Sequence, residues 1–253
     1  DELPPVEKMQ AIAAEVGYSE TAFIAPKTGR EKIVRYYSPE MEVSFCGHAT
    51  IASAVALADR GELGEFIFST LAGEIPVQVE MNEKKYEASL VSVEPRTREA
   101  DSDFLKTVLS ILNWKDEDIN RKLPPMLAYA GAWHLILAVK ELPVLNGLKY
   151  DFDKLKSVMQ QQNLTTLQLI FRESEKVFHS RNPFPVGGVV EDPATGAAAA
   201  AFGGYLRVQN LIEVASTFVI RQGEAMGRAS LLHGNIPAAG GIVVSGSAVT
   251  IES

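Results

Sequence analysis

The sequence predicts an α+β protein built from two similar halves, each organised around one central helix. The main observation is a repeat: a run of small residues begins at Gly47, and a second run of the same construction begins at Gly196. A second match lies 26 or 27 residues further on, where Gly73 and Gly223 each follow a β-like run and precede a Glu. Many other segments have the pattern of strands and few have that of helices. Two copies this far apart do not form a solenoid, so we predict two halves whose central helices begin at a common cleft.

The second central helix follows a loop with the sequence Glu-Asp-Pro-Ala-Thr-Gly, residues 191–196. Pro193 suits the turn before a helix, where its missing N–H is not needed. Thr195 is the predicted N-cap, with its hydroxyl accepting from the first turn. Residues 197–201 are all Ala, which has the highest helix propensity, and their small side chains predict a closely surrounded helix. The alternative interpretation is an Ala-rich core helix with an ordinary cap.

The first central helix is predicted from the small residues that follow Gly47 and to end near Gly61. Aligning Gly47 with Gly196 places Cys46 opposite Thr195. Because helix N-termini carry free N–H groups and the positive end of the dipole, both starts are candidate anion sites. His48 adjoins the first start, and the dipole there favours its neutral imidazole.

The rest of the first half is predicted to contain one further helix and five strands. Met9, Ile12, Ala13 and Val16 are spaced for one helical face, and Gly17 is the predicted stop. The predicted helix covers 9–16, and the predicted strands cover 18–26, 32–37, 65–71, 75–81 and 86–93.

The second half is predicted to begin after a charged linker over 94–102, which gives an N-terminal half of 1–97 and a C-terminal half of 98–253. Its predicted helices cover 103–113 and 152–162, and its predicted strands cover 126–129, 133–139, 167–171, 177–181, 217–220, 229–232 and 241–251. The last strand is free to return to the N-terminal half.

Composition excludes several classes of function. The formal net charge of −8 argues against nucleic acid or an anionic membrane as partner. A single Cys allows no internal disulfide, which fits a reducing compartment, and the predicted location is the cytoplasm. No apolar run approaches the roughly 20 residues of a membrane span, and no signal peptide is visible. The nucleotide-binding glycine motifs are absent, and the four histidines lie far apart without an acid at ligand spacing, so we expect no metal.

Four motifs together resemble the PhzF-like proteins, the phenazine-biosynthesis isomerase family, which is related in fold to diaminopimelate epimerase. They are Ser-Glu-Thr-Ala-Phe at 19–23, Cys-Gly-His-Ala-Thr at 46–50, Glu-Asp-Pro-Ala-Thr-Gly at 191–196 and Gln-Gly-x-x-Met-Gly-Arg-x-Ser at 222–230. The resemblance covers nearly the whole chain. The family normally begins with a strand, an Asp-Ala-Phe motif and a Gly-Asn-Pro motif, and we expect this chain to lack them.

This resemblance implies two α/β halves, each a curled sheet wrapped on its central helix, with the active site between them. It implies no cofactor, no metal and a homodimer. It assigns the acid/base role to Glu20, and it carries over His48 and Asp192 as the other catalytic residues.

The substrate-binding positions implied by the motifs are Gly47, Thr195, Gly196 and Ala197. A Ser commonly stands where this chain has Ala197, so a hydroxyl contact is lost while the backbone N–H remains. The expected partner is a small carboxylate substrate, held by N–H groups at the two helix starts.

The expected chemistry is movement of a proton along a conjugated acid. One carboxyl can remove a C–H proton and return it elsewhere if it is poised between its two states. Burial beside apolar groups such as Phe23 is expected to raise the pKa of Glu20. His48 and Asp192 would orient the substrate or relay a proton.

Two other functions stay open on the sequence. A cofactor-independent racemase or epimerase would use a thiol at each helix start, but only Cys46 is present and Thr195 occupies the second position. A non-enzymatic binding protein could also use this scaffold, since fold does not fix function. The presence together of Glu20, His48 and Asp192 argues against a simple binder.

Overall fold

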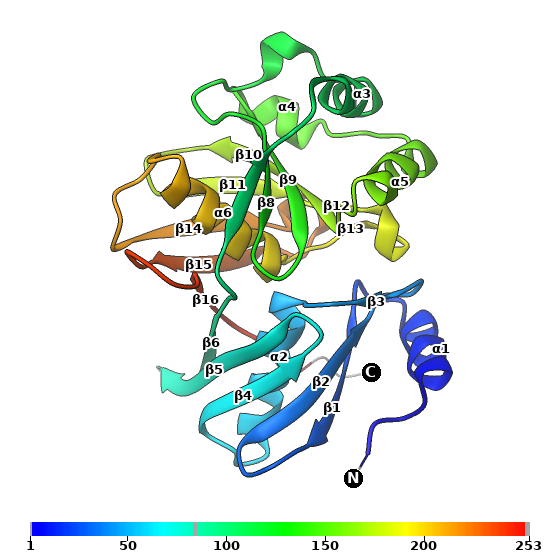
Figure 1. Cartoon of the computed structure of the whole chain (residues 1–253), viewed down its shortest axis with the longest axis vertical. Helices are drawn as coiled ribbons and strands as arrows, with labels where there is room; N and C mark the ends of the chain where they lie inside the picture. The colour runs from blue at the N-terminus through cyan, green and yellow to red at the C-terminus, as the bar shows by residue number, and fades with distance from the viewer. Residues whose placement is uncertain (1, 83–84, 251–253) are drawn as a thin grey trace.

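A computed structural model describes residues 2–82 and 85–250, which form two lobes (Figure 1). The lower lobe in Figure 1 is formed by the N-terminal part of the chain. Its helices are α1 (Val6–Val16) and α2 (Gly47–Asp59), and its strands are β1 (Thr21–Pro26), β2 (Glu31–Tyr37), β3 (Glu42–Val43), β4 (Gly64–Thr70), β5 (Gly73–Asn82) and β6 (Lys85–Val91).

The upper lobe contains the remaining elements. Its helices are α3 (Ser102–Leu112), α4 (Leu142–Asn146), α5 (Phe152–Gln161) and α6 (Gly196–Val208). Its strands are β7 (Arg96–Glu99), β8 (Met126–Tyr129), β9 (Trp133–Val139), β10 (Thr166–Arg172), β11 (Val177–Arg181), β12 (Pro183–Phe184), β13 (Val189–Glu191), β14 (Ser216–Gln222) and β15 (Ser230–Ile236). In the part of the chain that the structure describes, no helix has both the length and the apolar character needed to cross a membrane.

One continuous sheet runs through both lobes, in the order β1-β2-β4-β5-β6-β16-β15-β14-β11-β10-β9-β8-β7. The last strand, β16 (Val243–Ser247), is the link between them, because it pairs antiparallel with β6 on one side and with β15 on the other. Val244, for example, lies opposite Leu90 of the lower lobe and Gly234 of the upper lobe. The predicted α+β fold with two halves, each containing a central helix, is confirmed.

The two central helices fill the inside of the curled sheet. Helix α2 packs against β5, β6 and β16, whereas α6 packs against β15, β8 and β7, and the two helices contact each other. All residues of α6 from Gly196 to Leu206 are buried. A helix enclosed on every side needs small side chains, and the Ala-rich run supplies them. The predicted burial of this helix is therefore confirmed.

A cluster of buried apolar side chains lies between the helices α3, α4 and α5 and the strands β8, β9 and β10. Figure 1 shows these three helices on the outer side of the upper lobe. Asp101 caps α3, accepting from the N–H groups of Asp103 and Phe104 at 2.9 and 3.0 Å. The buried face of α3 consists of Phe104, Val108 and Leu112, which follow one another at the four-residue spacing of one helical face.

The predicted linker over 94–102 is wrong, because residues 96–99 form strand β7, paired with β8. Arg96 lies over the ring of Tyr129 at 4.6 Å, and Arg98 over that of Trp133 at 4.9 Å. The charges that suggested a linker belong to an exposed edge strand, which natural sheets commonly protect with charged side chains. The limits 1–97 and 98–253 stay a prediction. Helix α4 and the short strands β3, β12 and β13 were not predicted, and Ile251 of the last predicted strand lies outside the described residues.

Candidate active site

The N-termini of α2 and α6 meet between the lobes at Gly47 and Gly196. A Cβ placed on Gly47 would lie 2.5 Å from the Cα of Gly196, and one on Gly196 would lie 2.8 Å from the Cα of Gly47. Such an approach of two backbones is possible only without side chains. The internal repeat therefore predicted correctly that the two helix starts face one another.

Neither N-cap residue, Cys46 or Thr195, caps its helix with its side chain. The Thr195 hydroxyl instead donates to Asp192 Oδ2 at 2.7 Å and accepts from Gln222 Nε2 at 2.9 Å. The prediction that this hydroxyl caps the helix is wrong, because its donation to Asp192 turns it away from the first turn and it accepts from Gln222 Nε2 instead of a backbone N–H. First-turn N–H groups have no partner within their own helix, so both starts keep the character of an anion site.

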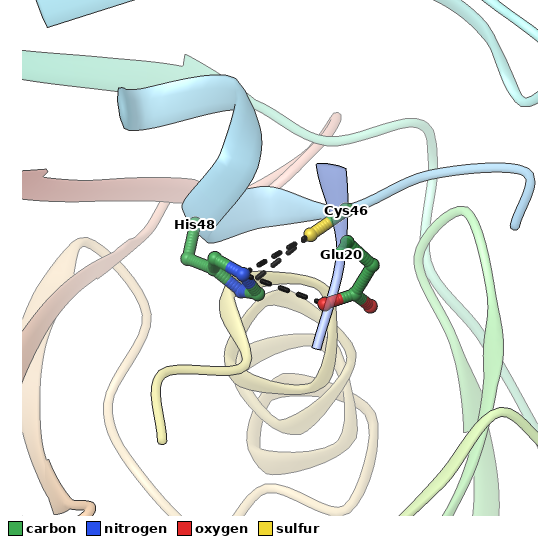
Figure 2. Close-up of side chains that lie close together, drawn as sticks. All are labelled: Glu20, Cys46 and His48. Carbon is green, nitrogen blue, oxygen red and sulfur yellow. Dashed lines mark hydrogen bonds and ion pairs between the residues drawn. The ribbon is translucent and has the colours of Figure 1, made fainter. Parts of the chain in front are cut away.

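His48 stands at the centre of the predicted catalytic residues (Figure 2). Its Nε2 lies 3.4 Å from Glu20 Oε2, and its Nδ1 lies 3.6 Å from Asp192 Oδ2. Cys46 Sγ is 3.5 Å from Nδ1 and 3.7 Å from Nε2. Figure 2 shows the side chains of Glu20, Cys46 and His48 pointing toward one another. The structure thus brings Glu20 from the start of β1, His48 from α2 and Asp192 from the loop before α6 into one cluster.

Glu20 is held in a buried position at this cluster. Its side chain is 6% exposed, and its Oε2 has no hydrogen-bond partner of good geometry. Burial, followed by the negative charge of Asp192, raises the pKa of Glu20 from 4.5 to about 7, although His48 acts in the opposite direction. The rise agrees in direction with the sequence-based expectation. Phe23, which was expected to supply the apolar surroundings, packs its ring against Tyr37.

The pKa of His48 differs from the sequence-based expectation. Burial lowers it, but the carboxylates of Asp192 and Glu20 outweigh burial, and the net pKa is raised above 6.5. The prediction that the helix dipole favours a neutral imidazole is therefore wrong, because two acids lie closer to the ring than the sequence indicated. Burial and the charges of Glu20 and Asp192 also raise the pKa of the Cys46 thiol well above its usual value.

Two cavities meet at His48. One, of about 690 Å³, is also lined by Ala194, Lys85 and Leu232. The other, of about 470 Å³, is lined by Glu20 and Ala49 together with His48. His48 therefore lies between a cavity large enough for a small acid and the cavity that reaches Glu20.

The predicted substrate-binding residues Gly47, Thr195, Gly196 and Ala197 surround the junction of the two helices, and none of them lines either cavity at His48. Their backbones are buried by the contact between α2 and α6. Their role in substrate binding stays a prediction.

Gln222 was not among the predicted site residues, but it organises the loop that carries Asp192. Its Nε2 donates to the Asp192 carbonyl at 2.7 Å as well as to Thr195, while its Oε1 accepts from the Thr195 N–H at 3.3 Å. Ser19 was also missed, and its Oγ lies 3.3 Å from His48 Nε2. The signal for each was its membership of a motif, since Ser19 opens the Ser-Glu-Thr-Ala-Phe motif and Gln222 opens the motif over 222–230.

The raised pKa of Glu20 predicts a pH-dependent stability. Because Glu20 binds its proton more tightly in the folded protein than in the unfolded chain, it favours folding at low pH, and stability falls as pH rises from 4.5 to about 7. Glu20→Gln changes the free energy of unfolding at each pH. We expect this change to be more stabilising at pH 8 than at pH 4.5 by about 2–3 kcal/mol. Urea unfolding of both proteins at the two pH values, in the presence of EDTA, measures this difference. An equal effect at both pH values would contradict the raised pKa.

Comparison with known proteins places this arrangement in a family. The model of the PhzC-PhzF family, described as phenazine biosynthesis-like protein, matches residues 5–253. The uncharacterized isomerase YfhB of Bacillus subtilis is 29% identical, with 98% of this chain and 87% of the relative covered. The trans-2,3-dihydro-3-hydroxyanthranilate isomerase of Pseudomonas fluorescens is 28% identical, with 99% of this chain and 88% of the relative covered.

A solved structure supports the same conclusion. The crystal structure of the Bacillus anthracis phenazine biosynthesis protein of the PhzF family superposes with a TM-score of 0.81 at 26% identity, with 98% of this chain and 88% of that chain covered. The fold is of the diaminopimelate epimerase type, and the named relatives are isomerases. From the family match, the relatives and the shared fold, we conclude that this chain belongs to the PhzC-PhzF family of phenazine biosynthesis-like proteins.

Proposed function

We propose that this chain is an isomerase that moves a proton along a small carboxylate substrate, without a cofactor and with Glu20 as the general acid/base. The observation that carries the proposal is the buried carboxyl of Glu20, which lies beside His48 at the junction of two helix N-termini. The pKa of this carboxyl is raised to about 7. At neutral pH such a group populates both its basic and its acidic form. One residue can therefore remove a proton and return it.

The reaction begins with the carboxylate of Glu20 taking a proton from a C–H bond of the substrate. The electron pair of that bond moves along the conjugated system, and protonated Glu20 then delivers its proton to a different carbon. Negative charge develops on the substrate in between, and the positive ends of α2 and α6 stabilise it. His48 holds Glu20, and Asp192, fixed by Thr195 and Gln222, orients the His48 ring.

The substrate class follows from the charges at the site. We place the substrate in the cavity of about 470 Å³ that Glu20 and His48 both line, where the N-terminus of α2 favours an acid. Its carboxylate is held by N–H groups at Gly47 and Ala197 once the contact between the two helix starts loosens, because neither residue lines a cavity while the helices touch. The Gly196 N–H already donates to the Ala194 carbonyl at 3.1 Å, and Thr195 holds the second helix start. The named substrate of the Pseudomonas fluorescens relative is an acid of this kind, so it is the first compound to test.

The rival function, epimerisation through thiols, has less support. The raised pKa of Cys46 keeps its thiol protonated and makes it a poor base. The residue at the equivalent position of the second helix is Thr195, whose hydroxyl is bound by Asp192 and Gln222. No second base is therefore placed where a two-thiol mechanism needs one.

Proton exchange in heavy water, followed by NMR, tests the proposed function. We expect the protein to introduce deuterium at a carbon of trans-2,3-dihydro-3-hydroxyanthranilate, or of another acid in a panel of amino and hydroxy acids, together with a shift of a double bond. Exchange at a stereocentre without such a shift, lost in Cys46→Ala, would establish the epimerase instead. An absence of exchange with every acid tested would argue for a binding protein.

A further inference from the structure

We propose that Glu20, Cys46 and His48 form a binding site for a soft divalent cation, with Zn²⁺ as the best fit, and that the bound cation keeps substrate from reacting. The metal binding stands on the geometry alone. Only its effect on turnover rests on the proposed function. Among the residues that the structure describes, these three side chains form a group of potential metal ligands whose ligand atoms all lie within 4.8 Å of one another (Figure 2).

The spacing of the three ligand atoms matches tetrahedral zinc. Bonds of about 2.3 Å to sulfur and about 2.0–2.2 Å to nitrogen and oxygen put neighbouring ligands about 3.4–3.6 Å apart. His48 Nε2 is 3.4 Å from Glu20 Oε2 and 3.7 Å from Cys46 Sγ. These two distances lie within a few tenths of an ångström of the tetrahedral values, and the third, between Cys46 and Glu20, is at most 4.8 Å, so the two side chains close around the cation as it binds. The set of one thiolate, one imidazole and one carboxylate is typical of zinc ligation. The Cys46 thiol is protonated without the cation, so binding of zinc displaces its proton to solvent.

The second nitrogen of His48 has the partner that a metal-bound histidine needs. Its Nδ1 lies 3.6 Å from Asp192 Oδ2, so the tautomer with its N–H on this nitrogen has a carboxylate beside it. Nε2 then accepts the cation in place of its contact with Ser19 Oγ at 3.3 Å. A carboxylate behind a ligating histidine fixes the ring and its tautomer. Asp192 is itself held by the Thr195 hydroxyl at 2.7 Å, so the ring is oriented before any cation arrives.

Charge and access also favour a cation. Glu20 and Asp192 place two carboxyl groups beside one imidazole in a buried setting, and the charge of Asp192 contributes to the raised pKa of Glu20. A divalent cation compensates these charges and removes the repulsion between them. The site is reached through the cavity of about 470 Å³ that Glu20 and His48 line, which leaves room for water as a fourth ligand.

The consequence for the proposed reaction follows from Glu20. Coordination occupies the oxygen that would take the proton from the substrate, and it ties up His48 at the same time. A cation held here therefore acts as an inhibitor that competes with substrate. Removal of zinc from the site by a chelator would restore turnover.

A second histidine in the chain supplies a matched control. His179 also lies between two carboxylates, with Nε2 2.9 Å from Glu173 and Nδ1 3.4 Å from Glu224. Like His48 it presents a different nitrogen to each acid, but it has no thiol beside it, since Cys46 is the only cysteine. The variants Cys46→Ser and His179→Gln therefore separate the proposed site from binding of metal by a histidine between two carboxylates alone.

The experiment titrates the chelator-treated full chain with Co²⁺ and records its absorption, followed by displacement with Zn²⁺ and calorimetry. We expect one cation per chain, a thiolate-to-cobalt charge-transfer band and tight binding of zinc. Cys46→Ser should lose the band and weaken zinc binding more than about 100-fold, because removal of a direct ligand costs more than removal of an outer partner. His179→Gln should leave the band and the affinity unchanged. Cys46→Ala provides a second variant, and near-ultraviolet circular dichroism checks that each variant is folded.

Absence of the charge-transfer band from the wild-type protein would overturn the site, as would unchanged zinc affinity in both Cys46 variants or loss of binding in His179→Gln. Exchange measurements with zinc then test inhibition. Zinc should lower the deuterium-exchange rate of the wild-type protein, and EDTA should restore that rate. The exchange rate of Cys46→Ser should change little when zinc is added. Full exchange activity with zinc bound would overturn the exclusion of substrate. Metal binding with no exchange activity at all would overturn the proposed function alone, and the site would stand.

Discussion

Replacing Glu20 by glutamine is expected to reduce kcat by about 10²–10⁴-fold without loss of the fold, because general acid/base catalysis contributes about that much to a reaction rate. Glutamine has nearly the same shape but can neither remove nor return a proton. The buried position also accepts the neutral amide, since the pKa of about 7 shows that the site tolerates a neutral group. Rates of deuterium incorporation, measured with the acid found active for the wild type, give the comparison.

A matched control is the same change at Glu31, on the strand next to β1. The Glu31 side chain is 39% exposed and pairs with Lys27 at 2.9 Å, so Glu31→Gln removes a carboxylate at the end of the strand away from Glu20. We expect its rate to stay within about twofold of wild type, since surface ion pairs contribute little. If Glu20→Gln kept more than about a tenth of the wild-type rate, Glu20 would not be the acid/base.

The features best predicted from the sequence are those that one short segment determines. The close contact of α2 with α6 requires glycine at both helix starts, so the presence of Gly47 and Gly196 in the sequence indicates this contact. The enclosed position of α6 demands small side chains, and a run of alanines at 197–201 records that. The end of α1 at Gly17 follows the same logic, because capping is local.

The features that were missed depend on contacts between segments far apart in the chain. The Thr195 hydroxyl binds Asp192 because Gln222 holds the loop, and nothing in the sequence near Thr195 indicates this. The raised pKa of His48 arises from Glu20 and Asp192, which approach it from a different strand and a different lobe. The same approach brings the ligand atoms of Glu20, Cys46 and His48 within 4.8 Å of one another, which the spacing of the histidines and acids in the sequence did not indicate.

Edge position explains the error at β7. Local composition at 94–102 is charged, which is typical of linkers, but it is equally typical of a sheet's edge strand. What decides between them is the neighbouring strand β8, whose Tyr129 offers its ring to Arg96. Composition alone lacks that partner and so cannot distinguish the two structures.

Substituting alanine for Gly47 is expected to lower the free energy of unfolding by at least about 3 kcal/mol. The new Cβ would lie 2.5 Å from the Cα of Gly196, 2.6 Å from its carbonyl carbon and 2.7 Å from the N of Ala197. These are backbone atoms, which cannot rotate away as a side chain could, so the two helices must separate. Overpacking of this kind costs more than the roughly 1 kcal/mol that alanine gains over glycine in a helix. Urea unfolding followed by circular dichroism measures the loss.

The appropriate control is Gly246→Ala in β16, where the nearest atoms to a new Cβ are 3.8 Å away, in ordinary contact. Its effect should stay within about 1 kcal/mol, since glycine in a strand carries no such constraint there. If Gly47→Ala were no more destabilising than Gly246→Ala, the helix starts would not be held in direct contact. Because His48 adjoins Gly47 and Asp192 precedes Gly196 by only a few residues, separation of the helices also pulls these side chains apart. Gly47→Ala should therefore lose activity even under conditions where the variant remains folded, which would show that the contact between the two helices is what assembles the catalytic cluster.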